Sequence, residues 1–174
     1  GLNFDPLPEM VTARNPEPRF LLVGRDFKRK GGEVLLEAFR QVRRKMRNAT
    51  IVIIDPELHN LPDGVECRGF SRRENPAHVE ILEEEYRKAS VYVLPSLYEP
   101  FGISLLEAMA HGLPCIGVRE FAMPEIIVEG ETGLLVERGD AGSLANAMLE
   151  IAASPPMGTE FGIAGRKRLE TQFT

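Results

Sequence analysis

Two glutamates flank a glycine-containing loop in the stretch 94–117. Glu99 lies in a short loop after an apolar run, and Glu107 lies eight residues later on a helix that Gly102 opens. The first N–H groups of a helix lack partners, and the helix dipole adds about half a positive charge there. A phosphate at that end would satisfy both, and carboxylates accept hydrogen bonds from sugar hydroxyls. The pattern predicts a site for an anionic ligand that also carries hydroxyls.

A longer motif runs from Glu99 to Ala110, with the sequence Glu-Pro-Phe-Gly-Ile-Ser-Leu-Leu-Glu-Ala-Met-Ala. It resembles the E-x7-E signature of retaining, nucleotide-sugar-dependent glycosyltransferases of family 4. The resemblance covers about residues 19–173 and implies the C-terminal, donor-binding half of a GT-B fold. It also implies transfer of a sugar from a nucleotide diphosphate sugar to an acceptor, with no cofactor and no obligatory metal.

A basic loop from Arg25 to Gly32 follows the first predicted strand. Its cations and glycines favour a cradle for a diphosphate, at the edge of the sheet where open α/β folds bind ligands. The alternative interpretation is a solvated basic turn. The resemblance implies that Arg25 and Lys30 hold the donor diphosphate, whereas Lys28 and Arg29 are expected to be solvated.

The resemblance also implies a role for each site residue. Arg25, Lys30 and Glu99 form the catalytic set: the cations neutralise the departing diphosphate, and Glu99 binds hydroxyls of the transferred sugar. Glu107 binds the ribose hydroxyls. Further donor contacts are implied for Gly24, Gly69, Phe70, Ser71, Pro100, Phe101, Gly102 and Ile103.

Other interpretations of these residues stay open. A glutamate on an amphipathic helix, such as Glu107, is usually a surface residue, and a loop carboxylate such as Glu99 often caps the helix that follows. His111 is predicted to cap that helix and offset its dipole rather than act in catalysis. The alternative functions are a non-catalytic nucleotide or phosphosugar-binding module, or another GT-B enzyme such as a nucleotide-sugar epimerase or a glycogen synthase relative.

The elements that must position these residues alternate along the chain. Apolar runs predict six strands, separated by amphipathic helices, which indicates an α/β, Rossmann-like, doubly wound parallel sheet in the order 3-2-1-4-5-6. Residues 1–18 hold four prolines and predict a linker or an extended lead-in. The resemblance implies that the donor-binding domain covers 19–174, with the N-terminal acceptor domain absent. The predicted strands are 19–24, 50–55, 65–70, 91–94, 115–118 and 134–136, and the predicted helices are about 33–47, within 72–88, 102–111, 121–127, after Asp140, and after Pro155-Pro156 to about Phe173.

The composition of the 174 residues is that of an ordinary globular protein, with 43% hydrophobic and 27% charged residues. A net charge of −5 argues against a nucleic-acid partner. No apolar run is long enough to cross a membrane, although peripheral membrane contact of the full-length protein stays open. Cys67 and Cys115 are expected to be buried free thiols, which suits the cytoplasm. The sugar, the nucleobase and the acceptor are not specified by the sequence.

Overall fold

The structure is a computed structural model that describes residues 6–54, 58–69 and 74–174. Within these ranges, six strands form one parallel sheet in the order β3-β2-β1-β4-β5-β6. The predicted fold class and strand order are confirmed. The strands are β1 (Arg19–Val23), β2 (Thr50–Ile54), β3 (Val65–Cys67), β4 (Val91–Val93), β5 (Cys115–Val118) and β6 (Gly133–Val136).

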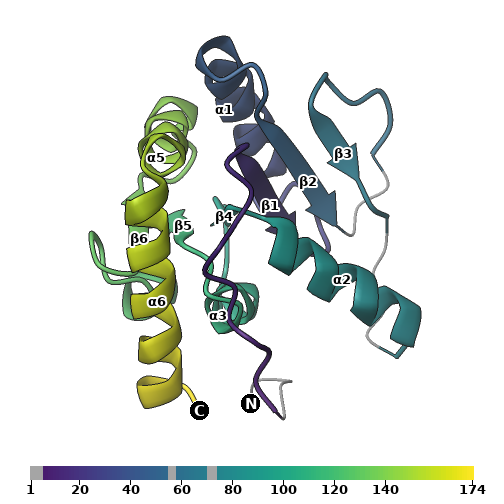
Figure 1. Ribbon diagram of the computed structural model, residues 1–174. Helices are drawn as coiled ribbons and strands as arrows, with labels where there is room; N and C mark the ends of the chain where they lie inside the picture. Colours follow the sequence, from purple (N-terminus) through teal and green to yellow (C-terminus); the bar gives the residue numbers. More distant parts are fainter. Residues whose placement is uncertain (1–5, 55–57, 70–73) are drawn as a thin grey trace.

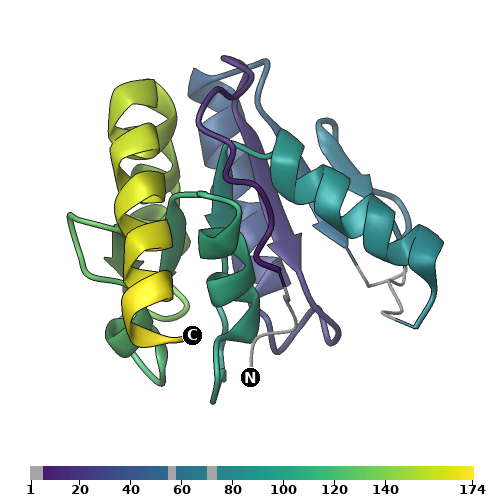
Figure 2. The same cartoon turned by 60° about the horizontal axis from the view of Figure 1, so that its bottom comes forward.

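Helices cover both faces of this sheet, as a doubly wound fold requires. Helix α1 packs against α5, and α3 packs against α6. Figure 1 shows α1 behind the sheet and α2 in front of it, and the turned view in Figure 2 keeps them on opposite sides. The helices of the described residues are α1 (Gly32–Lys45), α2 (Pro76–Lys88), α3 (Ile103–Ala110), α4 (Met123–Ile126), α5 (Ala141–Ala153) and α6 (Pro155–Gln172).

Strand β1 lies at the centre of the sheet because its apolar side chains can be buried on both faces. Leu21 pairs in parallel register with Val52 of β2 and Tyr92 of β4, and all three side chains are fully buried. Burial on two faces explains the continuous apolar runs in the sequence. The carboxyl ends of β1 and β4 therefore lie next to each other at one edge of the sheet, where the loops with the predicted site residues begin.

Local signals set several helix ends. The Asp140 side chain accepts a hydrogen bond from the Ser143 N–H at 2.9 Å, so the predicted N-cap of α5 is confirmed. Proline fits the first turn of a helix, where no N–H partner is needed. Accordingly, Pro155 and Pro156 do not precede α6 but begin it. Of the two cysteines, Cys115 is buried as predicted, whereas Cys67 is half-buried on edge strand β3.

The leading segment, residues 6–18, forms no helix or strand and runs over the face that carries α3 and α6 (Figures 1 and 2). Arg14 fixes it by donating to the carbonyl oxygens of Tyr86, Arg87 and Ala89 at the end of α2, and to that of His111 at the end of α3.

Among the described residues, none of the helices combines the length and the apolar character needed to cross a bilayer.

Candidate donor-binding site

A pocket of about 380 Å³ opens at the carboxyl edge of the sheet, above the ends of β1 and β4. The predicted cations and both predicted glutamates lie on its wall, although they are spread over more than 80 positions of the sequence. Its lining residues are Val23, Gly24, Arg25, Arg29, Lys30, Glu74, Leu82, Glu99, Phe101, Ile103, Ser104 and Glu107.

Gly24, at the end of β1, makes room for a cation. Its φ of +152° is rare for residues with a side chain, and a Cβ placed there would lie 2.8 Å from Cε of Lys30. The aliphatic stem of Lys30 therefore lies over the bare backbone of Gly24. The resemblance implied a donor contact for Gly24, and Gly24 does line the pocket, while the space that a side chain would occupy is filled by the lysine stem.

Lys30 forms an ion pair with Glu99 across the pocket. Its Nζ donates to Glu99 Oε2, and the two residues are only 9% and 5% exposed. Arg29 reaches the same carboxylate oxygen at 3.8 Å and donates to the Tyr98 carbonyl at 2.9 Å. The prediction that Arg29 is merely solvated is therefore wrong. Its guanidinium lines the pocket because the loop turns it toward the segment after β4.

Glu99 also caps α3. Its Oε1 accepts the Gly102 N–H at 3.1 Å, so the capping interpretation holds, and this amide is engaged by protein rather than open to a phosphate. Burial by itself raises the pKa of the carboxyl group. The hydrogen bond and charge of Lys30, with the backbone N–H groups of Gly102 and Phe101, outweigh it and hold the Glu99 pKa below its usual range.

Glu107 lies deeper on α3 and is buried, being 1% exposed. The Tyr86 hydroxyl donates to its Oε2 at 3.1 Å, and the Tyr86 ring stacks on the His111 ring with centroids 4.7 Å apart. His111 Nδ1 lies 2.9 Å from the Glu107 carbonyl oxygen. Glu107 is therefore not a surface residue of an amphipathic helix, and its carboxylate is held in place from α2.

The other predicted site residues divide into three groups. Arg25 is exposed, and Phe101 is 72% exposed; both line the pocket, as does Ile103. Gly69, Pro100 and Gly102 are not among its lining residues, and the Gly102 N–H is bonded to the Glu99 carboxylate. Phe70 and Ser71, predicted to meet the nucleobase, lie outside the described residues.

Comparisons with known proteins show the family to which this chain belongs. The family model for glycosyl transferases group 1 matches residues 5–168. The chain belongs to this family. A GDP-mannose-dependent alpha-(1-6)-phosphatidylinositol monomannoside mannosyltransferase from Mycolicibacterium smegmatis is 28% identical over 168 residues, which cover 86% of this chain and 42% of that protein.

Solved structures of similar proteins share the fold. Sucrose-phosphate synthase from Thermosynechococcus elongatus aligns with a TM-score of 0.78 and 35% identity, over 91% of this chain and 42% of that one. A C-terminal domain of a glycosyl transferase group 1 family protein from Francisella tularensis aligns with a TM-score of 0.76 and 23% identity, over 95% and 96% of the two chains. The chain thus spans less than half the length of the curated relative and of the synthase, and has the fold of one GT-B domain.

Sequence reasoning missed several residues that line the pocket of this group 1 domain. Glu74 and Leu82 come from the segment around α2, and Ser104 comes from the first turn of α3. The Tyr86 ring belongs to the buried core, and its hydroxyl contacts Glu107. A tyrosine rather than phenylalanine at a buried position was the available signal, because a buried hydroxyl needs a partner.

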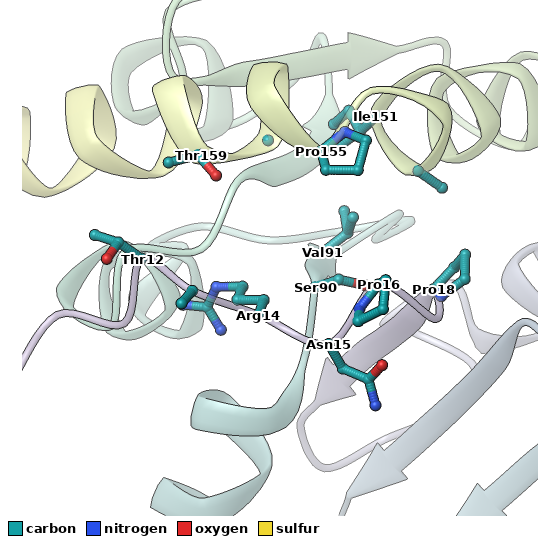
Figure 3. A pocket seen from close by; sticks show the side chains of 13 residues that line it. Thr12, Arg14, Asn15, Pro16, Pro18, Ser90, Val91, Ile151, Pro155 and Thr159 are labelled. Atoms are coloured by element: carbon teal, nitrogen blue, oxygen red, sulfur yellow. The ribbon is translucent and has the colours of Figure 1, made fainter.

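The group 1 domain has a second pocket, of about 290 Å³, at the opposite edge of the sheet (Figure 3). It is bounded by the leading segment, the start of β4 and the junction of α5 and α6, with Asn15, Ser90 and Pro155 among its lining residues. Open α/β sheets bind ligands at the carboxyl ends of their strands, whereas this pocket lies at the amino ends. The position favours the first pocket as the candidate donor site.

Proposed function

We propose that this chain is the donor-binding half of a retaining glycosyltransferase of family 4, in which Glu99 and Glu107 are the two ends of the E-x7-E motif. The observation that carries the proposal is the convergence of Arg25, Lys30, Glu99 and Glu107 on one pocket beside the N-terminus of α3. Cations, a helix N-terminus and two carboxylates together suit a ligand with a diphosphate and two sets of sugar hydroxyls.

The cations act on the leaving group. In the proposed reaction the bond between the sugar and the diphosphate breaks, and negative charge grows on the departing phosphate. Arg25 and Lys30 stabilise that charge where it develops, which lowers the barrier, and the dipole of α3 adds to their effect. Because these groups supply the positive charge, the proposed reaction needs no metal ion.

The two glutamates bind the two sugars of the donor. Glu107 lies past the first turn of α3 with its carboxylate held by Tyr86, and we assign it to the ribose hydroxyls. Glu99 lies in the loop ahead of α3, on the far side of the phosphate position, and we assign it to hydroxyls of the transferred sugar. A carboxylate that accepts from hydroxyls makes a charge-assisted hydrogen bond, which is stronger than a neutral one.

The acceptor belongs to the rest of the protein in this proposal. The chain matches less than half of its full-length relatives, so we assign acceptor binding and further active-site groups to a separate N-terminal half. These 174 residues alone are expected to bind a nucleoside diphosphate weakly and to transfer no sugar. A non-catalytic binding module would bind the same ligands, but its full-length protein would not transfer sugar.

Calorimetry with UDP, GDP and ADP tests the proposed function. We expect one of them to bind, and Glu107→Gln to weaken that binding about fivefold, since losing a charge-assisted hydrogen bond costs about 1 kcal/mol. The matched control is Glu160→Gln, which removes the same charge from the exposed face of α6. Unchanged affinity in Glu107→Gln, with an intact circular dichroism spectrum, would refute the assignment of the ribose site.

A further inference from the structure

Lys30, one of the two cations assigned to the donor diphosphate, is already paired with a carboxylate. Lys30 Nζ donates to Glu99 Oε2, and both side chains are nearly buried, with 11% and 7% of the side-chain surface exposed. Pairing at low exposure is strong because water does not screen it well. A diphosphate that enters the pocket therefore competes with Glu99 for Lys30.

Losing Lys30 is costly for Glu99. Its Oε1 would keep the Gly102 N–H, but its Oε2 would lose the ammonium. Arg29 does not replace that partner at hydrogen-bond distance, because it lies 3.8 Å from Oε2 and donates to the Tyr98 carbonyl. A buried carboxylate that loses its partner carries a desolvation penalty, and this penalty weakens the binding of the diphosphate.

We propose, on the basis of the proposed function, that the Lys30–Glu99 ion pair makes this pocket select an intact nucleotide sugar over the free nucleoside diphosphate. Both ligands draw Lys30 away from Glu99. Only the nucleotide sugar brings hydroxyl donors that can take the place of the ammonium at Oε2. Glu99 is thus a specificity-determining residue, and it opposes the product as well as holding the substrate.

The same exchange works in reverse after the reaction. Once the sugar has left, Oε2 has neither hydroxyl nor ammonium as a partner while the diphosphate holds Lys30. Return of Lys30 to Glu99 restores the ion pair and weakens the binding of the nucleoside diphosphate. A simpler arrangement is that Lys30, which has three donors, contacts Glu99 and the phosphate together. In that case Glu99 reduces the binding of both ligands equally, and there is no selectivity.

Glu99→Gln separates these cases, because glutamine keeps an oxygen for the Gly102 N–H and loses the charge that holds Lys30. Calorimetry would compare UDP with UDP-glucose and GDP with GDP-mannose, for the whole 174-residue chain. We expect Glu99→Gln to raise the affinity for the free diphosphate several-fold and to lower that for its sugar conjugate. These two changes multiply, so the affinity ratio of conjugate to diphosphate falls about tenfold or more.

Glu74→Gln is the matched control, since Glu74 lines the same pocket and no ion pair joins it to Lys30 among the described residues. It removes the same charge, so both affinities should rise alike and their ratio should stay constant. A second test uses Lys30→Gln as the background, where adding Glu99→Gln should no longer raise the affinity for the free diphosphate.

The outcomes are distinct. If Glu99→Gln changes both affinities by the same factor, upward as in Glu74→Gln or downward as for a lost helix cap, selectivity by the ion pair is refuted. Persistence of the gain in the Lys30→Gln background refutes it as well. Thermal unfolding of each variant identifies loss of fold as a cause. If the wild-type chain binds none of these four nucleotides and does not bind ADP, the proposed function itself fails, and this inference fails with it.

Discussion

A largely buried cation lies at the amino ends of the strands (the amino edge of the sheet), and another lies at their carboxyl ends (the carboxyl edge). The two cations have different kinds of partner. At the amino edge, Arg14 donates to four backbone carbonyl oxygens at the ends of α2 and α3. At the carboxyl edge, Lys30 is paired with a single side chain, Glu99. Burial lowers the pKa of Arg14 to about 10, which still leaves it charged at neutral pH.

The difference separates a structural cation from one available to a ligand. Carbonyl groups at helix C-termini are fixed by the helices and carry partial negative charge, so a cation among them is held in one geometry. A carboxylate on a loop can exchange one partner for another. Arg14 therefore contributes to folding, whereas we propose that a bound anion replaces the partner of Lys30.

The largest expected effect is at the amino edge. Arg14→Met removes the donors to the carbonyl groups and keeps much of the apolar stem, so we expect a loss of about 3 kcal/mol in the free energy of unfolding. Urea denaturation measures it, and the affinity of the folded variant for UDP or GDP should stay within about twofold of wild type. A loss below about 1 kcal/mol would mean that water replaces the guanidinium at these carbonyls.

An intermediate effect is expected at the carboxyl edge, and it falls on binding. Lys30→Gln should weaken binding of the preferred nucleoside diphosphate by about 1.5–3 kcal/mol, the range for a hydrogen bond to a charged group. Its free energy of unfolding should change less than that of Arg14→Met. The control is Lys28→Gln, an exposed position in the same loop, whose small effect should vanish at high salt. Equal destabilisation by Lys30→Gln and Arg14→Met would contradict the contrast between the two edges.

The smallest expected effect is a pH dependence of stability that comes from Glu99. Because its pKa is lower in the folded state than in the unfolded state, its contribution is complete above the ordinary glutamate pKa and is lost as the pH falls through the folded value. Wild type and Glu99→Gln would be compared by urea denaturation from about pH 6 to pH 3. The stability advantage of wild type should shrink toward acid pH, and an advantage that stays constant would show that Glu99 is not the group responsible.

The fold could be predicted because its signals are local. Continuous apolar runs mark strands buried on two faces, and Asp140 marks the start of a helix through its own side chain. Small errors arose where a residue type fits two structures. Pro155 and Pro156 were predicted to break the chain before the last helix, but proline also fits a first helical turn, and these two residues begin α6. The burial of Cys67 was overestimated because β3 lies at the edge of the sheet, and strand order decides that exposure.

The candidate site was predicted less completely, because contacts between distant segments leave no local trace. Lys28, Arg29 and Lys30 are adjacent cations, and only the path of the loop turns Arg29 toward the pocket.

His111 was predicted to offset the dipole of α3, but burial lowers its pKa and disfavours its charged form. The cations at that helix end are Arg14 and Arg166, which bind the carbonyls of His111 and Ala110 from 97 and 56 positions away.

The anchoring of the leading segment has a consequence for exchanging halves between related proteins. Arg14 ties this segment to α2 and α3, the Val11 N–H donates to the His111 carbonyl, and Arg166 of α6 donates to the Pro8 carbonyl. A chimaera joined at Arg19 would separate these donors and acceptors, although sequence patterns place the first strand there. A junction before Pro8 would carry the whole interlocked unit into the new protein. The part of the protein that can be exchanged as one unit therefore begins before its first strand.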